Sequence, residues 1–278
     1  MLDLTIYAVP FFIILIALEI LIGNWKNNQS YSKSDTIASL SLFAGNVLVI
    51  LATKSLFFLF YSQLYEYRIF TISANQWGWI AHFIAIDFVF YWFHRASHRV
   101  RFLWASHVNH HSSEHLNFAT ALRQSWTGPF MRPLFYWVLP ILGFNPMMIL
   151  TMGSLATIYG FWTHTEHINK LGIFEWIFVT PSHHRVHHGK DKEYIDHNYA
   201  NVFIIWDRLF GTFAPEGKQV TYGIRHSIDT YNVFIIAFHE WIALLKDFSS
   251  SKKLSIALRY WFRPPGWQPN ILETKVAR

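Results

Sequence analysis

Histidines at helical spacing are the residues of this sequence best suited to chemistry. The chain has 278 residues and 16 histidines. Most of these fall into four groups, which are His94 and His98; His107, His110 and His111; His164 and His167; and His183, His184, His187 and His188. Side chains three or four residues apart share one face of a helix, so each group presents several imidazoles together.

The number of clustered histidines indicates two metal sites. Imidazole nitrogen binds iron, zinc, copper and nickel, so the ligand type alone does not identify the metal. A structural zinc takes four ligands and a catalytic zinc typically three, so nine or ten histidines suffice for two sites. The chain has no cysteine, which excludes thiolate zinc sites, iron–sulfur clusters and disulfides.

Two adjacent histidine-ligated metals favour a di-iron centre, because no carboxylate occupies the main positions of the clusters. Such a centre would use O2 as co-substrate to attack an unactivated C–H bond of a lipid. Isolated histidines are more often packed or solvated than metal-bound. We therefore expect His82, His115, His226 and His239 not to be ligands.

The composition is typical of a membrane protein. Hydrophobic residues make up 52% of the chain and charged residues 14%, whereas soluble domains carry about 25% charged residues. The net charge of +6 suits anionic lipid headgroups as well as nucleic acid. The basic residues flank apolar runs, so we expect a lipid partner and no nucleic acid.

Three apolar stretches are long enough to predict membrane spans, at residues 4–22, 37–52 and 77–93. The first lacks the basic start and the cleavage site of a signal peptide, so it predicts an anchor. Arg95 and Arg99 follow the third stretch directly. By the positive-inside rule they place the active site on the cytoplasmic face, and we expect a multi-pass protein of a bacterial inner membrane.

A fourth apolar stretch, residues 134–162, predicts a helical hairpin. Pro140, Gly143 and Pro146 interrupt it, and Asn-Pro is a turn signal. A chain that enters the membrane and returns brings His164 to the same side as the earlier histidines. A single straight crossing would separate the groups and prevent a common site.

The expected fold is all-α. It is an integral membrane bundle of three spans plus a helical hairpin, with a cytoplasmic histidine-rich di-iron cap. One domain covers residues 1–278, with anchor helices at 1–76, a histidine-box catalytic core at 77–215 and a C-terminal amphipathic, interfacial segment at 216–278. Residues 233–245 are amphipathic, and a basic aromatic tail follows them.

The order of these motifs resembles a known family. His-Arg-x-x-His at 94–98, His-x-x-His-His at 107–111, a single later histidine, and His-x-x-His-His at 184–188 precede Trp-Asp-Arg-Leu-Phe-Gly-Thr at 206–212. This pattern resembles the fatty acid hydroxylase/sterol desaturase superfamily of integral-membrane di-iron enzymes. Residues 107–125 and 181–189 look most similar to its alkylglycerol monooxygenase-like bacterial branch.

The resemblance implies nine iron ligands, namely His94, His98, His107, His110, His111, His164, His184, His187 and His188. His183 matches the motif as well, but we expect it to lie behind the ligands. His167 stands where that branch usually has an apolar residue, so it is left out. Whether either of these two is a direct ligand stays open, and no cofactor-binding residue besides the metal ligands is assigned.

Two carboxylates are candidates for catalytic support. Asp87 lies seven residues before His94 on the same helix face, where a buried carboxylate is expected to orient a ligating imidazole. The alternative is a hydrogen bond in helix packing. Glu114 follows the second group and is a candidate proton donor, or simply a solvated charge.

The expected activity is hydroxylation of a fatty acyl, sterol-like or alkyl-ether lipid by a membrane-bound monooxygenase. The chain has no cytochrome b5-like His-Pro-Gly-Gly segment. Electrons are therefore expected from a separate electron-transfer protein or a reduced pterin. Two alternatives remain, a desaturase with the same centre and a zinc-binding or zinc-transport membrane protein.

Overall fold

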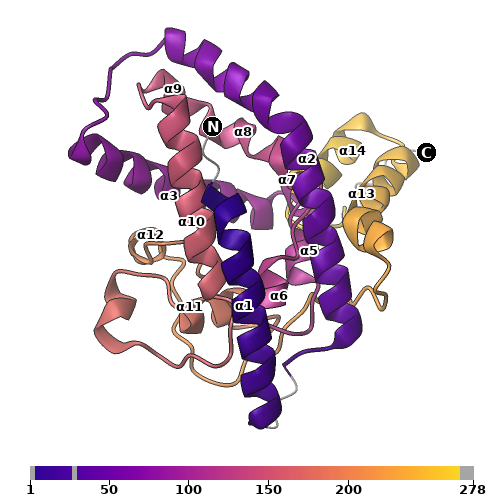
Figure 1. The fold of residues 1–278 in the computed structure, drawn as a ribbon. Coiled ribbons are helices and arrows are strands. Elements are labelled where there is room, and N and C mark those ends of the chain that lie inside the picture. Colours follow the sequence, from indigo (N-terminus) through magenta and orange to yellow (C-terminus); the bar gives the residue numbers. More distant parts are fainter. Residues whose placement is uncertain (1–3, 27–29, 270–278) are drawn as a thin grey trace.

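A computed structural model describes residues 4–26 and 30–269, and the regular secondary structure of this part of the chain is helical (Figure 1). The described residues contain no strand, only isolated bridges between Phe178 and Phe203 and between Gly189 and Tyr222. This confirms the all-α class. The predicted segments that reach into residues 1–3, 27–29 and 270–278 lie partly outside the described residues.

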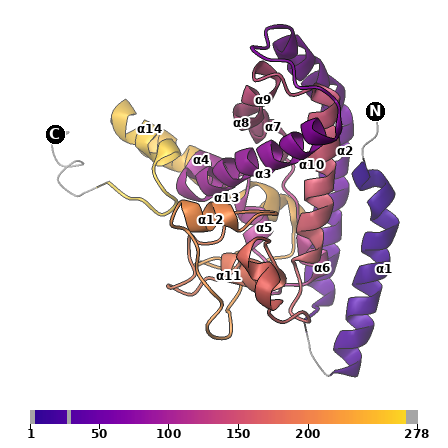
Figure 2. The same ribbon diagram turned by 90° about the vertical axis from the view of Figure 1, so that its left-hand side faces the viewer.

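Four long helices form the frame of the molecule. They are α1 (Leu4–Trp25), α2 (Lys33–Glu66), α3 (Gln76–Arg99) and α10 (Pro146–Trp162). In both views α3 runs across the direction of α10 (Figures 1 and 2). A hydrophobic core fills the space between α2, α3 and α10 and includes Tyr61, Ile86, Ile149 and Met152.

Nine short helices lie between residues 101 and 209 of the described chain. They are α4 (Arg101–Trp104), α5 (Val108–His111), α6 (Phe118–Ala121), α7 (Gly128–Met131), α8 (Pro133–Tyr136), α9 (Val138–Ile141), η1 (Gly172–Trp176), α11 (Pro181–His187) and α12 (Ile205–Leu209). In both views α5, α6, α11 and α12 gather on one side of α3 (Figures 1 and 2). We call this part of the molecule, residues 104–125 and 163–226, the cap.

The C-terminal segment forms two further helices, α13 (Val233–Ser250) and α14 (Leu254–Phe262), which pack on each other. The predicted amphipathic stretch 233–245 lies in α13. Arg101 ties this pair to the end of α3, because its guanidinium donates to Glu240 at 2.7 Å and to Asp247 at 2.6 Å. Phe102 adds a ring contact with Trp241 on one side and Trp261 on the other.

Two helices of the described chain, α1 and α2, are long and apolar enough to cross a membrane. The predicted third span lies within α3 but does not meet this test. The reason is in its sequence, since His82 and Asp87 interrupt the apolar run and His94 and His98 end it. The structure therefore supports two of the three predicted spans.

The chain reverses between α9 and α10, at the point where the sequence predicts the hairpin. The Asn145 side chain accepts the Met147 N–H and caps α10, whose first residue is Pro146. The turn rests against the loop after α2, where Ile72 N–H donates to the Gly143 carbonyl at 3.2 Å. From this turn α10 runs back to the cap, where His164 follows the end of the helix.

Gly143 should be the least replaceable residue of this turn. Its φ is +98°, and a Cβ there would collide with the Phe70 carbonyl oxygen. We expect Gly143→Ala to lower the free energy of unfolding by about 1–3 kcal/mol. Gly153 in α10 is a matched control, because its Cβ would meet nothing within 4 Å. Gly153→Ala should be neutral or stabilise by up to about 1 kcal/mol. Thermal unfolding of the purified variants measures the difference, and equal melting temperatures would contradict it.

Candidate metal centre

The structure gathers the nine histidines that the family resemblance implies as ligands into two groups. The first group, which we call the five-histidine group, consists of His94, His98, His107, His111 and His187. The second, the four-histidine group, consists of His110, His164, His184 and His188. Within each group the candidate donor nitrogens lie within 4.8 Å of one another, and all nine residues are buried or half-buried.

Helical spacing explains how each His-x-x-His-His motif contributes to both groups. On α5 and its cap residue, His107 and His111 are one turn apart and join the five-histidine group, whereas His110 joins the other. On α11 and its cap residue the division is reversed. His184 and His188 join the four-histidine group and His187 joins the first. The two short helices therefore link the two groups.

The groups adjoin each other. The rings of His111 and His188, which belong to different groups, stack with centroids 4.3 Å apart. His110 lies 4.6 Å from His188 and 5.4 Å from His111, measured between ring centroids. Metals held by the two groups would therefore be neighbours.

Several ring nitrogens face one another in an arrangement that suits metal ligands. His94 Nε2 faces His107 Nε2 at 2.9 Å, and His107 Nε2 also faces His111 Nε2 at 3.1 Å. In the other group His164 Nε2 faces His184 Nε2 at 2.9 Å and His110 Nε2 at 3.1 Å. A neutral imidazole has one donor and one acceptor nitrogen, so one nitrogen facing several others leaves lone pairs converging. A metal ion satisfies such a set.

Two buried nitrogen atoms give further support for a metal ion in the five-histidine group. The Nε2 atoms of His98 and His187 are buried and have no hydrogen-bond partner among the described residues. A buried polar atom without a partner costs free energy, so native proteins rarely retain one without a ligand for it. Both atoms belong to the five-histidine group. The donor set is all nitrogen, which suits iron or zinc.

Burial keeps the rings neutral, as metal binding requires. Desolvation lowers the pKa of His107, His111 and His187 well below the usual 6.5, and neighbouring histidines lower it further. In the four-histidine group, burial lowers the pKa of His164 to about 4. Lone pairs on these nitrogens are therefore available at neutral pH.

Backbone carbonyl groups orient three of the rings through their second nitrogen. His94 Nδ1 bonds the Tyr199 carbonyl at 2.6 Å, and His187 Nδ1 bonds the His197 carbonyl at 3.0 Å. His164 Nδ1 bonds the carbonyl of Gly160, one turn earlier in the chain, at 2.8 Å. Such bonds fix both the tautomer and the plane of a ligating ring.

Asp87 does not bond an imidazole, so the expectation that it orients a ligand directly is wrong. Its carboxylate accepts the N–H groups of Val202 and Phe203, each at 2.9 Å, and the indole N–H of Trp206 at 3.0 Å. The side chain is fully buried, and these donors compensate for the burial of its charge. Asp87 therefore holds the segment that follows Tyr199, and acts on His94 only through that segment.

Asp207 also fixes the backbone segment of residues 199–203. Its carboxylate accepts the N–H groups of Tyr199 and Ala200, each at 2.8 Å, and the Thr212 hydroxyl at 2.6 Å. The hydrogen bonds of Asp207 therefore go to the backbone and to Thr212 and tie this segment down. Two buried carboxylates, from α3 and α12, thus immobilise residues 199–203.

Glu114 lies outside both groups. Its side chain is 59% exposed and its carboxylate is 3.9 Å from the ammonium group of Lys190. An exposed carboxylate at this position does not contact the clustered rings, so the expected role as a proton donor is not supported. The alternative, a solvated charge, agrees with the structure.

His183 and His167 also lie outside the groups. His183 Nδ1 accepts the Thr180 N–H at 3.4 Å at the start of α11. Its ring contacts Phe213 instead of the clustered imidazoles. The structure likewise leaves His82 and His115 out of both groups.

Sequence reasoning missed Arg123, which ties α5 to the frame. Its Nε–H donates to the Asn109 carbonyl and the Ser112 hydroxyl, each at 3.0 Å. Its Nη1–H donates to Asp35 of α2 at 3.3 Å, and the arginine is 2% exposed. The available signal was a single arginine beside the apolar pair Ala121-Leu122, together with an acidic residue at the start of an apolar helix.

We expect Asp87→Asn to weaken metal binding while the chain still folds. The amide keeps one acceptor oxygen but turns an NH2 group toward a backbone N–H, which loosens residues 199–203 and the Tyr199 carbonyl. Loss of such support typically lowers metal affinity by about 10- to 100-fold. Asp191→Asn is the control, because Asp191 accepts the Thr221 N–H at 2.7 Å in a segment that orients no clustered ring. Metal titration of both variants tests this expectation. Equal metal affinities would show that Asp87 contributes only to packing.

Comparisons with known proteins agree with the geometry of the site. Residues 79–212 match the family model described as fatty acid hydroxylase. The chain is 39% identical over 265 residues to an alkylglycerol monooxygenase of Xenopus tropicalis, which covers 94% of this chain and 59% of the relative. The alkylglycerol monooxygenase of Homo sapiens is 39% identical over 267 residues, with the same coverage. An ornithine lipid hydroxylase, OlsE of Rhizobium tropici, is 30% identical over 155 residues, covering 52% of this chain and 45% of the relative.

The chain thus spans about three fifths of the length of these two alkylglycerol monooxygenases. No solved structure matches it. The matched residues 79–212 contain all nine clustered histidines as well as Asp87 and Asp207. Residues 79–212 therefore match the fatty acid hydroxylase family, to which the histidine motifs of the sequence show a resemblance.

Proposed function

We propose that this protein is a membrane-bound, O2-dependent di-iron oxygenase that hydroxylates a C–H bond of a lipid. The observation that carries the proposal is the pair of adjoining, buried, all-histidine groups within residues 79–212, which match the fatty acid hydroxylase family model. Relatives named alkylglycerol monooxygenase and ornithine lipid hydroxylase support a lipid substrate. The substrate class proposed here is a lipid with a fatty acyl, sterol-like or alkyl-ether chain.

The five-histidine group would hold one iron and the four-histidine group the other. Iron in such sites supplies the activation of O2, with two electrons from a donor outside this chain. We propose a separate electron-transfer protein or a reduced pterin as that donor. Zinc would fit the nitrogen donors as well, but zinc has no redox chemistry and a structural zinc takes only four ligands.

The residues of this chain position the metal ligands and exclude water from the site. The nine rings are supplied by α3, by α5 and α11 with their cap residues, and by His164, two residues after α10, so the site assembles only when these elements pack together. Carbonyl groups of Tyr199, His197 and Gly160 keep three rings in their ligating tautomer. Because the rings are buried, the lipid chain must reach them through the protein and not through bulk water.

In the membrane, we propose that α1 and α2 cross the bilayer and that α3 returns the chain to the cytoplasmic side. Arg95, Arg99 and Arg101 then mark the cytoplasmic boundary. Residues 134–162 would enter the membrane and return as the predicted hairpin. The cap with both histidine groups lies on the cytoplasmic face in this arrangement.

Single cysteines test this topology, because the chain has none of its own. Positions 73, 114 and 192 are exposed. A membrane-impermeant thiol reagent added to intact cells should label Ser73→Cys and leave Glu114→Cys and Lys192→Cys unlabelled until the cells are opened. Labelling of Glu114→Cys and Lys192→Cys from opposite sides of the membrane would be incompatible with a common site.

Metal content tests the ligand set. We expect His110→Ala and His187→Ala, one from each group, to lower bound iron by about half or more and to abolish turnover. His115→Ala is the control, because His115 lies outside both groups and should keep its iron. Elemental analysis of the purified proteins gives the iron per chain. Undiminished iron in both cluster variants would refute the assignment.

Lipid analysis tests the activity itself. A host that produces the chain under 18O2 should accumulate a lipid that has gained one 18O atom, and a host that produces His110→Ala should not. A product that has lost two hydrogens and gained no label would identify a desaturase instead. No changed lipid, together with zinc in place of iron, would contradict an oxygenase.

A further inference from the structure

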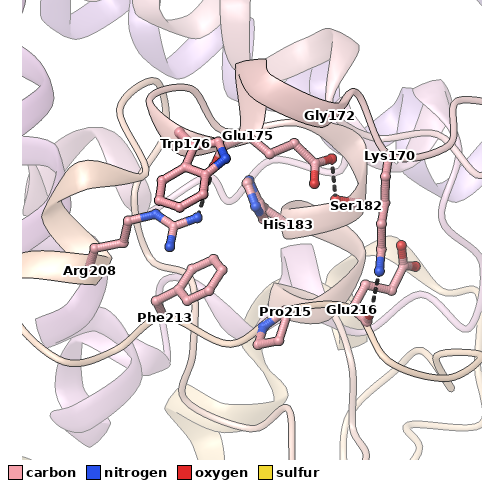
Figure 3. Close-up of a pocket in the computed structure, with 10 residues that line it drawn as sticks. All are labelled: Lys170, Gly172, Glu175, Trp176, Ser182, His183, Arg208, Phe213, Pro215 and Glu216. Carbon is pink, nitrogen blue, oxygen red and sulfur yellow. Dashed lines mark hydrogen bonds between the residues drawn. The ribbon is translucent and has the colours of Figure 1, made fainter.

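A cavity of about 220 Å³ lies in the cap beside α11, and the metal groups do not include its lining residues (Figure 3). It is bordered by η1, by the first turn of α11, by Arg208 of α12 and by residues 213–216. His183 points into it, although His183 is the direct neighbour of His184 in the four-histidine group (Figure 3). The function proposed above gives this cavity no role.

Arg208 is fixed in position at one end of the cavity. Its guanidinium carbon lies 3.9 Å from the centroid of the Phe213 ring and 5.4 Å from that of Trp176. Its Nη2–H donates to the Glu175 carbonyl at 3.0 Å. A guanidinium has five N–H donors, so the remaining ones are left for a ligand. A stacked, fixed guanidinium suits the oxygens of a phosphate or carboxylate group.

Two further donors line the cavity. Lys170 Nζ uses one hydrogen for the Glu216 carbonyl at 2.7 Å, and an ammonium group has three. His183 Nδ1 accepts the Thr180 N–H, so its Nε2 carries the ring proton. Figure 3 shows the Arg208 and His183 side chains directed to the same space, with Lys170 farther along the wall.

The two carboxylates of the wall already have partners. Arg185 binds Glu216 through two N–H groups, at 2.5 Å and 2.7 Å. Glu175 Oε1 accepts three hydrogen bonds, from the Leu171 N–H and from the hydroxyls of Thr180 and Ser182. The groups left for a ligand are therefore mainly donors, two of them cationic, and they suit an anion with several oxygens.

The rim beside this cavity is apolar and exposed. On η1, Ile173 is 79% exposed, Phe174 is 62% exposed and Trp176 is 68% exposed. Leu209, next to Arg208, is 67% exposed. Exposed apolar and aromatic side chains beside cations are the pattern of segments that lie at the headgroup level of a bilayer. A free phosphate ion would not use this rim.

We propose that this cavity binds the phosphate group of an anionic glycerophospholipid, while η1 inserts its apolar side chains at the boundary between headgroups and acyl chains. Arg208 and His183 hold the phosphate oxygens, and Lys170, farther along the wall, adds positive charge. The site is separate from the metal groups and does not require the oxygenase activity. It anchors to the membrane surface the helix α11, which together with its cap residue carries three of the clustered histidines.

Lipid binding to the full chain in neutral detergent tests this site. A short-chain phosphatidylglycerol should bind, as followed by native mass spectrometry, and the matching diacylglycerol without phosphate should not compete. Arg208→Gln should weaken binding about tenfold or more, since a charge-assisted hydrogen bond is lost, and Lys170→Gln by a smaller factor. Lys192→Gln is the control, because Lys192 is exposed on the cap and does not line the cavity.

Metal content and melting temperature of each variant show whether it is folded, and Lys170→Gln keeps the test valid if Arg208→Gln does not fold. Equal phosphatidylglycerol binding by wild type, Lys170→Gln and any folded Arg208→Gln would overturn the proposal. Full displacement of the lipid by millimolar inorganic phosphate would also overturn it, because the cavity would then bind free phosphate and the apolar rim would add nothing.

Discussion

The structure depends on the burial of nine neutral imidazoles whose nitrogens face one another. His107 Nε2 has two such neighbours within 3.1 Å, and so has His164 Nε2. Lone pairs that converge in this way repel, and burial removes the water that would otherwise satisfy them. A metal ion at the centre of each group would turn this unfavourable arrangement into a stabilising one, because metal binding would then contribute to folding.

Backbone segments around the imidazoles hold the rings in position. Residues 199–203 present the Tyr199 carbonyl to His94, and the buried carboxylates of Asp87 and Asp207 fix that segment through its N–H groups. Arg123 fixes α5 in a comparable way through Asn109 and Asp35. Charged residues in the interior thus act on backbone segments and not on the imidazoles. This leaves the donor set free of carboxylates.

Much of the site could be predicted from spacing, because His-x-x-His-His places ligands on one helix face whatever surrounds it. The reversal at Gly143 was also predictable from local turn chemistry. The partition into groups of five and four was not, since it depends on how α5 and α11 pack against each other. Asp87 and Glu114 show the same limit. The sequence shows that a carboxylate is close to a motif. Only the packing decides whether that carboxylate contacts a ring, a backbone N–H or solvent.

The central claim is that the two groups hold a pair of neighbouring irons. Mössbauer spectroscopy of the full chain, purified after growth on 57Fe and combined with elemental analysis, tests this most directly. We predict about two irons per chain and, in the oxidised protein, a spectrum of antiferromagnetically coupled ferric ions. One iron per chain, uncoupled ferric ions or stoichiometric zinc would contradict the account.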